Sequence, residues 1–149
     1  MKNKFNILFV CKYNRFRSKI AAAYFNKINK NQNIRAESAG LIAGFSPLNK
    51  NQIKAARDFG ILLTGKTRAL SMDLLNKQDK IIVVADNVPR EVFDVPSNAK
   101  KEYPYAKKVI IWKITDVTSG NIFENSQKII KQIIKKVDEL NAQLERSRK

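Results

Sequence analysis

The stretch Phe5 to Ser18, FNILFVCKYNRFRS, decides the fold of this 149-residue chain. Its first half, Phe5 to Val10, is a near-continuous apolar run, which is typical of a β-strand that is covered on both faces. After Lys19, apolar residues recur with the spacing of an amphipathic α-helix, at Ala21, Tyr24, Phe25 and Ile28. The order is therefore strand, short loop and helix, with the loop at the carboxyl end of the strand and the amino end of the helix.

This loop combines a thiol with an anion-binding geometry. A helix amino terminus presents unpaired backbone N–H groups and a partial positive charge, and no proline removes a donor between Lys12 and Ser18. The same field and the Arg17 guanidinium favour the thiolate form of Cys11. Arg17 also offers a planar fork that fits two phosphate oxygens, and the Ser18 hydroxyl can donate to the sulfur. The pattern C-x5-R-S thus predicts a nucleophile facing an oxyanion clamp, although Cys11 alone could be a small core residue.

The sequence resembles the low-molecular-weight protein tyrosine phosphatases, whose signature loop, C-x-x-N-x-C-R-S, follows the first strand. Four residues match this signature, namely Cys11, Asn14, Arg17 and Ser18. Three positions differ: Phe16 replaces the usual second cysteine, Tyr13 a frequent glycine and Lys19 a frequent proline. The resemblance continues through the segments 37–40, 81–86 and 112–116, so it covers nearly the whole chain.

The resemblance implies a cysteine-dependent protein tyrosine phosphatase that hydrolyses phosphomonoesters through a cysteinyl-phosphate intermediate. Its catalytic residues would be Cys11, Arg17 and Asp116, with Asp116 as the general acid and base. The phosphate-binding residues would be Lys12, Tyr13, Asn14, Arg15, Phe16 and Ser18, and neither a metal nor a cofactor is implied. Ser38, through a hydrogen bond to Asn14, and Asp86 would support the loop.

The sequence offers alternatives for three of these assignments. Asp116 lacks the proline and tyrosines that usually follow it in the family, so the aromatic wall expected to grip a phosphotyrosine ring is missing. Asp94 is the competing acid, but it follows a predicted helix and precedes no strand end. Asp86 can instead cap a helix that starts near Pro89, which is the favoured interpretation, and Ser38 can simply end a strand.

The rest of the chain alternates strands with helices. We expect strands at 34–38, 80–85 and 109–112, and helices at 49–59, 72–76 and along the amphipathic pattern Ile130, Ile133, Val137, Leu140 and Leu144. Gly60 provides a helix end and Ser71 a helix cap. Leu41, Ile42 and Phe45 either wall the substrate entrance or pack inward. The alternation predicts one α/β domain over residues 1–149, a doubly wound three-layer sandwich with a four-stranded parallel sheet in the order 2-1-3-4.

Composition restricts the classes of function. One cysteine and no histidine exclude Cys-His and Ser-His-Asp catalysis, His-bearing metal sites and an intrachain disulfide. A formal charge of +16 favours phosphorylated or acidic partners, but the lysines are spread along the chain, so we expect no specific nucleic-acid site. No apolar run suits a signal peptide or a membrane span. We therefore expect a cytoplasmic monomer that acts on phosphorylated protein or small aryl phosphates and binds phosphate or another oxyanion in its loop.

Two other functions remain open. Arsenate reductases share this fold and loop, but their thioredoxin-coupled relay needs further cysteines, so only a version that uses an external thiol is compatible with this chain. The second is a noncatalytic phosphate- or phosphoprotein-binding module, which Tyr13, the missing aromatic wall and the high positive charge favour.

Overall fold

Four parallel strands form one sheet in the computed structural model, which describes residues 4–45, 47–94, 105–117 and 119–147. The strands are β1 (Phe5–Cys11), β2 (Ile34–Gly40), β3 (Lys80–Val84) and β4 (Val109–Trp112). They lie in the order β2-β1-β3-β4, with Phe9 of β1 paired to Ser38 on one side and to Ile82 on the other. The predicted α/β class, parallel sheet and strand order are thus confirmed.

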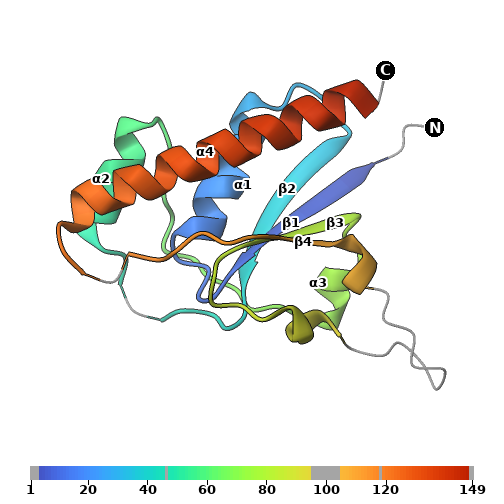
Figure 1. Ribbon diagram of the computed structural model, residues 1–149, viewed down its shortest axis with the longest axis horizontal. Helices are drawn as coiled ribbons and strands as arrows, with labels where there is room; N and C mark the ends of the chain where they lie inside the picture. Colours follow the sequence, from blue (N-terminus) through green and yellow to red (C-terminus); the bar gives the residue numbers. More distant parts are fainter. Residues whose placement is uncertain (1–3, 46, 95–104, 118, 148–149) are drawn as a thin grey trace.

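Strand β1 is apolar from Ile7 to Val10 because both faces of the sheet are covered (Figure 1). Its side chains alternate between the faces: Ile7 and Phe9 belong to one core, and Leu8 and Val10 to the other. All four are fully buried. The carboxyl ends of β1, β3 and β4 meet at one edge of the sheet, where ligands bind in open parallel sheets.

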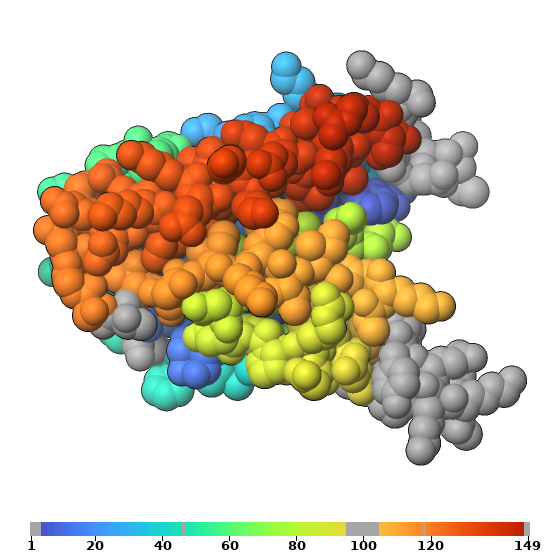
Figure 2. Space-filling model, viewed as in Figure 1, coloured from blue at the N-terminus to red at the C-terminus, as the bar shows by residue number. Residues whose placement is uncertain are grey.

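Three longer helices cover the face of Ile7 and Phe9: α1 (Arg17–Ile28), α2 (Lys50–Asp58) and α4 (Ile122–Ser147). The other face is covered by α3 (Met72–Asn76) and the 3₁₀ segment η1 (Arg90–Phe93), and a second 3₁₀ segment, η2 (Ala106–Lys108), leads into β4. Helix α4 lies across the length of one side of the molecule (Figure 2). Among the described residues, no helix combines the length and apolar character that a membrane span requires.

The end signals of α2 and α3 act as predicted. At the end of α2, Gly60 has a φ of 73°, and its N–H donates to Arg57 O while the N–H of Ile61 donates to Ala56 O. This pair of bonds is a Schellman motif, which satisfies two terminal carbonyls. Ser71 caps α3, because its hydroxyl accepts the Leu74 N–H at 3.1 Å.

The prediction that Asp86 caps a helix near Pro89 is wrong. The helix there is the short η1, with Pro89 at its cap position and no side-chain cap hydrogen bond. Asp86 instead faces the end of β4, where it accepts a hydrogen bond from the Thr115 hydroxyl at 3.1 Å. Its other oxygen lies 3.7 Å from the Arg17 guanidinium. The Asp86 carboxylate therefore faces a cation that is remote in the sequence, and not the amino end of a helix.

Candidate active site

The loop between β1 and α1 is held from one side by the chain that follows β2. Leu41, Ile42 and Gly44 donate backbone hydrogen bonds of 2.9 to 3.0 Å to the carbonyls of Cys11, Lys12 and Tyr13, respectively. Among the described residues, the N–H groups of residues 12–17 have no acceptor, and no side chain caps α1. The carbonyls of the loop are therefore satisfied on its outer side, while its N–H groups and the helix amino terminus remain available to an anion.

Asn14 gives this loop its shape. Its φ is 56°, a left-handed conformation that asparagine tolerates better than most residues. The Asn14 amide nitrogen donates to the hydroxyls of Ser18 (2.9 Å) and Ser38 (3.0 Å), and its oxygen accepts the Arg68 N–H at 3.1 Å. The Asn14–Ser38 hydrogen bond that the family resemblance implies is thus present. Three separate segments converge on this one side chain, which is 2% exposed.

Gly40 and the Arg68 backbone are parts of this arrangement that the sequence did not indicate. A Cβ atom at Gly40 would lie 2.7 Å from the backbone nitrogen of Asn14 and 2.8 Å from the backbone carbonyl carbon of Tyr13. Only a glycine lets β2 approach the loop this closely. The E-S-A-G segment at 37–40 could have indicated this role, because a glycine at a strand end marks a close backbone approach.

The Cys11 sulfur lies 3.0 Å from the Ser18 hydroxyl oxygen. Because that oxygen accepts a hydrogen bond from Asn14, the hydroxyl proton is free to point at the sulfur. A hydrogen bond donated in this direction stabilises a thiolate more than a thiol. Cys11 is 3% exposed and belongs to the core cluster of Leu8 and Val10, as the alternative interpretation expects, but it also contributes to the wall of a pocket.

The Arg17 guanidinium is fixed by groups at the ends of β3 and β4. It donates to Ile114 O at 2.8 Å and to the Asn87 side-chain oxygen at 3.0 Å. Carboxylates of Asp86 and Asp116 lie 3.7 and 3.5 Å from its nitrogens. Arg17 is 2% exposed, yet it lines the same pocket as Cys11. This arrangement holds a buried cation, with its counter-charges, close to the thiol.

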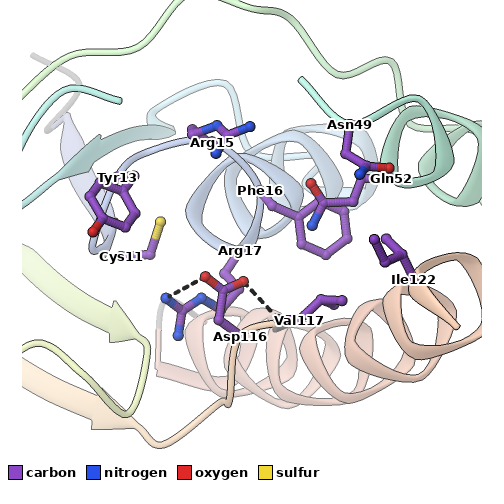
Figure 3. Close-up of a pocket in the computed structure, with 10 residues that line it drawn as sticks. All are labelled: Cys11, Tyr13, Arg15, Phe16, Arg17, Asn49, Gln52, Asp116, Val117 and Ile122. Carbon is purple, nitrogen blue, oxygen red and sulfur yellow. Dashed lines mark hydrogen bonds and ion pairs between the residues drawn. The ribbon is translucent and has the colours of Figure 1, made fainter. Parts of the chain in front are cut away.

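Asp116 lies at the wall of this pocket, between Arg17 and Val117 (Figure 3). One of its oxygens accepts the Val117 N–H at 2.9 Å, and its side chain is 33% exposed. A carboxylate that is accessible to solvent and lines the same pocket as the thiol can exchange a proton with a bound substrate. Asp94, the competing acid, is exposed at the carboxyl end of η1 and does not line the pocket.

The pocket has a volume of about 180 Å³ and draws its walls from four parts of the chain. Five lining residues come from the loop and the start of α1: Cys11, Tyr13, Arg15, Phe16 and Arg17. The other five are Asn49, Gln52, Asp116, Val117 and Ile122 (Figure 3). Asn49, Gln52 and Ile122 were not anticipated from the sequence. A glutamine among the alanines of the buried face of α2 was the available signal, since Gln52 is only 9% exposed.

The apolar residues of the loop after β2 neither line this pocket nor pack inward as a group. Phe45 is 96% exposed and Ile42 is 48% exposed, so inward packing is wrong for both, and neither they nor Leu41 contribute to the pocket. Tyr13, at 36% exposure, is the aromatic residue at the pocket mouth, with the Lys12 ammonium 5.2 Å from its ring.

Lys19 ties a further segment to the loop. Its ammonium donates to the carbonyl and hydroxyl oxygens of Thr64, at 2.9 and 3.1 Å, and to the carbonyl of Lys66. Burial lowers the pKa of Lys19 below its usual value, and the nearby Cys11 charge opposes that shift. Among the described residues, no group of three His, Cys, Asp or Glu side chains could hold a metal ion.

Comparison with known proteins identifies similar chains. The family model described as low molecular weight phosphotyrosine protein phosphatase matches residues 6–149. None of the curated proteins matches the sequence. Solved structures do match: a low molecular weight protein tyrosine phosphatase from T. tengcongensis is 22% identical, with a TM-score of 0.75 and coverage of 94% of this chain and 99% of the other.

Two further structures extend the range of relatives. The YwlE arginine phosphatase from Geobacillus stearothermophilus is 20% identical, with a TM-score of 0.77 and coverage of 96% and 94% of the two chains. An arsenate reductase from Archaeoglobus fulgidus is 24% identical, with a TM-score of 0.67 and coverage of 91% and 98%. At these identities, the likeness shows a shared fold.

Proposed function

The chain belongs to the low molecular weight phosphotyrosine protein phosphatase family, and on that premise we propose that it hydrolyses phosphotyrosine in proteins. The observation that carries the proposal is the loop itself. Cys11 lies 3.0 Å from a hydroxyl that can stabilise its thiolate, and it is followed by a run of N–H groups with no acceptor among the described residues. A nucleophile beside an anion cradle is what phosphoryl transfer to sulfur requires.

In the first step, the Cys11 thiolate attacks phosphorus, so that an S–P bond forms and the P–O bond to the leaving group breaks. The N–H groups of Lys12, Tyr13, Asn14, Arg15 and Phe16 and the Arg17 side chain bind the equatorial oxygens. Asp116 gives its proton to the leaving oxygen, which departs as a neutral phenol. Positioned donors of this kind stabilise charge that develops in the transition state.

In the second step, water attacks the phosphorus of the cysteinyl phosphate. Asp116, now a carboxylate, takes a proton from that water, and the S–P bond breaks to release inorganic phosphate. The Ser18 hydroxyl donates to the departing sulfur. Asn14 and Ser38 hold the shape of the loop, and Asp86 holds the orientation of Arg17. The reaction needs no metal or cofactor, and a reducing compartment such as the cytoplasm keeps Cys11 available as a thiol.

The depth of the pocket supports an aryl phosphate as the substrate. Cys11 is 3% exposed and Arg17 is 2% exposed, so a phosphate group must extend below the surface to meet them. A phosphotyrosine ring is long enough to do so, and it can contact Tyr13 on one side and Val117 and Ile122 on the other. These residues stand in for the aromatic wall that usually follows the catalytic aspartate.

Hydrolysis of p-nitrophenyl phosphate and its inhibition by vanadate test the proposal. Cys11→Ser should lose turnover but retain phosphate binding, because the loop amides remain and the hydroxyl is a far weaker nucleophile. Equal urea midpoints for this variant and the wild type would show that its fold is intact. Undiminished hydrolysis by Cys11→Ser would refute the nucleophile, whereas tight phosphate binding by a wild type without turnover would indicate a binding module.

The same preparation tests the arsenate alternative. With one cysteine, reduction of arsenate would have to consume an external thiol. Thiol-dependent arsenate reduction that exceeds hydrolysis of the aryl phosphate would reassign the activity.

A further inference from the structure

Arg15 places a second guanidinium at the pocket, and the reaction described above uses only its backbone N–H. Its side chain lines the pocket on the side opposite Asp116 (Figure 3). One terminal nitrogen donates to Pro47 O at 2.5 Å, and the stem lies against Gly44, where a Cβ atom would come within 2.7 Å of Arg15 Cδ. Gly44 thus leaves room for the arginine stem, and the bond to Pro47 holds its far end.

The charge of Arg15 is not compensated within the described part of the chain. None of the described carboxylates lies within 4.0 Å of it, whereas Arg17 has two such neighbours. The Arg15 Nε atom is buried and has no hydrogen-bond partner among the described residues. A partly buried cation with a free donor is screened less by water than an exposed one, so it attracts an anion.

A bound phosphate does not remove this imbalance. The phosphate charge is met by the loop N–H groups and Arg17, which face Cys11. Arg15 remains at the pocket wall, and its terminal nitrogen that does not donate to Pro47 can form a charge-assisted hydrogen bond to a carboxylate. The pocket contributes one carboxylate, Asp116, which lies 3.5 Å from Arg17. A substrate that brings a second anion would therefore complete the charge balance.

We propose that Arg15 makes this site select phosphotyrosine flanked by acidic residues over phosphotyrosine flanked by neutral ones. The inference rests on the proposed function and specifies its substrate class. The carboxylate of a neighbouring glutamate or aspartate binds the Arg15 terminal nitrogen that does not donate to Pro47, while the phosphate occupies the loop. A neutral amide of the same shape loses the charge attraction, so the selectivity is electrostatic.

Two phosphotyrosine peptides that differ only in glutamate or glutamine on both sides of the phosphotyrosine test this selectivity. For the wild type at low ionic strength, we expect kcat/KM to be about five- to tenfold higher for the glutamate peptide, the range for a partly screened charge pair. Added salt should reduce the ratio, because screening acts on the charge pair. Arg15→Gln should bring the ratio close to one, and Arg15→Lys should retain part of it.

The matched control is Arg35→Gln, which changes the net charge by the same amount. Arg35 is exposed near the amino end of β2, whereas the pocket lies at the carboxyl ends of the strands. This variant should keep the wild-type ratio. A preference caused by overall charge would instead decline equally in both glutamine variants.

The outcomes separate this inference from the proposed function. Equal hydrolysis of the two peptides by the wild type would overturn the selectivity and leave the phosphatase activity intact. An unchanged ratio in Arg15→Gln, or a wild-type ratio that does not respond to salt, would remove Arg15 from the explanation. If Arg15→Gln does not fold, the role of Arg15 is tested by the salt dependence of the wild-type ratio and by whether Arg15→Lys retains part of that ratio. No hydrolysis of either peptide or of p-nitrophenyl phosphate would overturn the proposed function and this inference with it.

Discussion

Replacement of Asn14 by alanine should be among the most damaging single changes to the loop. The substitution removes three hydrogen bonds, those to Ser18 and Ser38 and the one from the Arg68 N–H. It also leaves alanine at a φ of 56°, where a Cβ without a local hydrogen bond is strained. The partners of Asn14 would remain in a region that is nearly closed to water, since Asn14 itself is 2% exposed.

The expected loss can be worked out from these contacts. Each hydrogen bond contributes about 1 kcal/mol net, so the three together give about 3 kcal/mol. The left-handed conformation adds about 1 kcal/mol or slightly more for alanine. We therefore expect the free energy of unfolding to fall by about 4 kcal/mol. Asn14→Gly loses the same bonds but accepts the conformation, so it should be less destabilised than Asn14→Ala by about 1 kcal/mol.

Urea denaturation of the two variants and the wild type measures these differences. Phosphate affinity, measured in the same samples, should fall because the loop N–H groups are no longer held in one geometry. Asn51→Ala is the control, since Asn51 is exposed at the start of α2 and should change stability by less than about 0.5 kcal/mol. A loss below about 1 kcal/mol for both Asn14 variants would refute the view that this side chain holds the loop together.

Three further outcomes follow from the site and from α1. Lys19→Met removes three hydrogen bonds to residues 64–66 and should lower the free energy of unfolding by about 1–2 kcal/mol in urea; an unchanged urea midpoint would contradict this. Burial, and then the hydrogen bond to Asp138, raises the pKa of Tyr24 from 10.0 to about 12. The stability linked to this proton is therefore complete below pH 10 and is lost as the pH rises through about 12; phenolate absorbance should show Tyr24 ionising at lower pH in Asp138→Asn. Asp116→Asn should slow aryl phosphate hydrolysis by about 10²–10⁴ while Asp94→Asn stays near the wild type, and the reverse result would make Asp94 the acid.

Much of the fold could be predicted because its signals are local. The apolar runs at 5–10 and 81–84 are long enough to identify strands that are buried on both faces. Gly60 and Ser71 end and begin helices through hydrogen bonds that span at most five positions. Within the site, Cys11, Asn14, Arg17 and Ser18 are close in sequence, so their spacing alone places them together.

The missed parts of the site depend on tertiary packing. Asn49 and Gln52 reach the pocket because the alanines of α2 pack in the same core as α4, which brings the start of α2 over the loop. No local pattern specifies that approach. The error at Asp86 has the same origin, since a short-range capping rule gave way to an ion pair with Arg17, 69 positions away in the sequence.

The phenyl ring at position 16 has a consequence for oxidation. Peroxide converts a thiolate to a sulfenic acid, which is usually rescued when a second thiol condenses with it to form a disulfide. Phe16 is 3% exposed and packs in the core, and the chain contains no other cysteine. An oxidised Cys11 therefore cannot form an intramolecular disulfide. Recovery of an oxidised Cys11 must then come from a reductant small enough to enter the pocket, before the sulfur proceeds to the irreversible sulfinic acid.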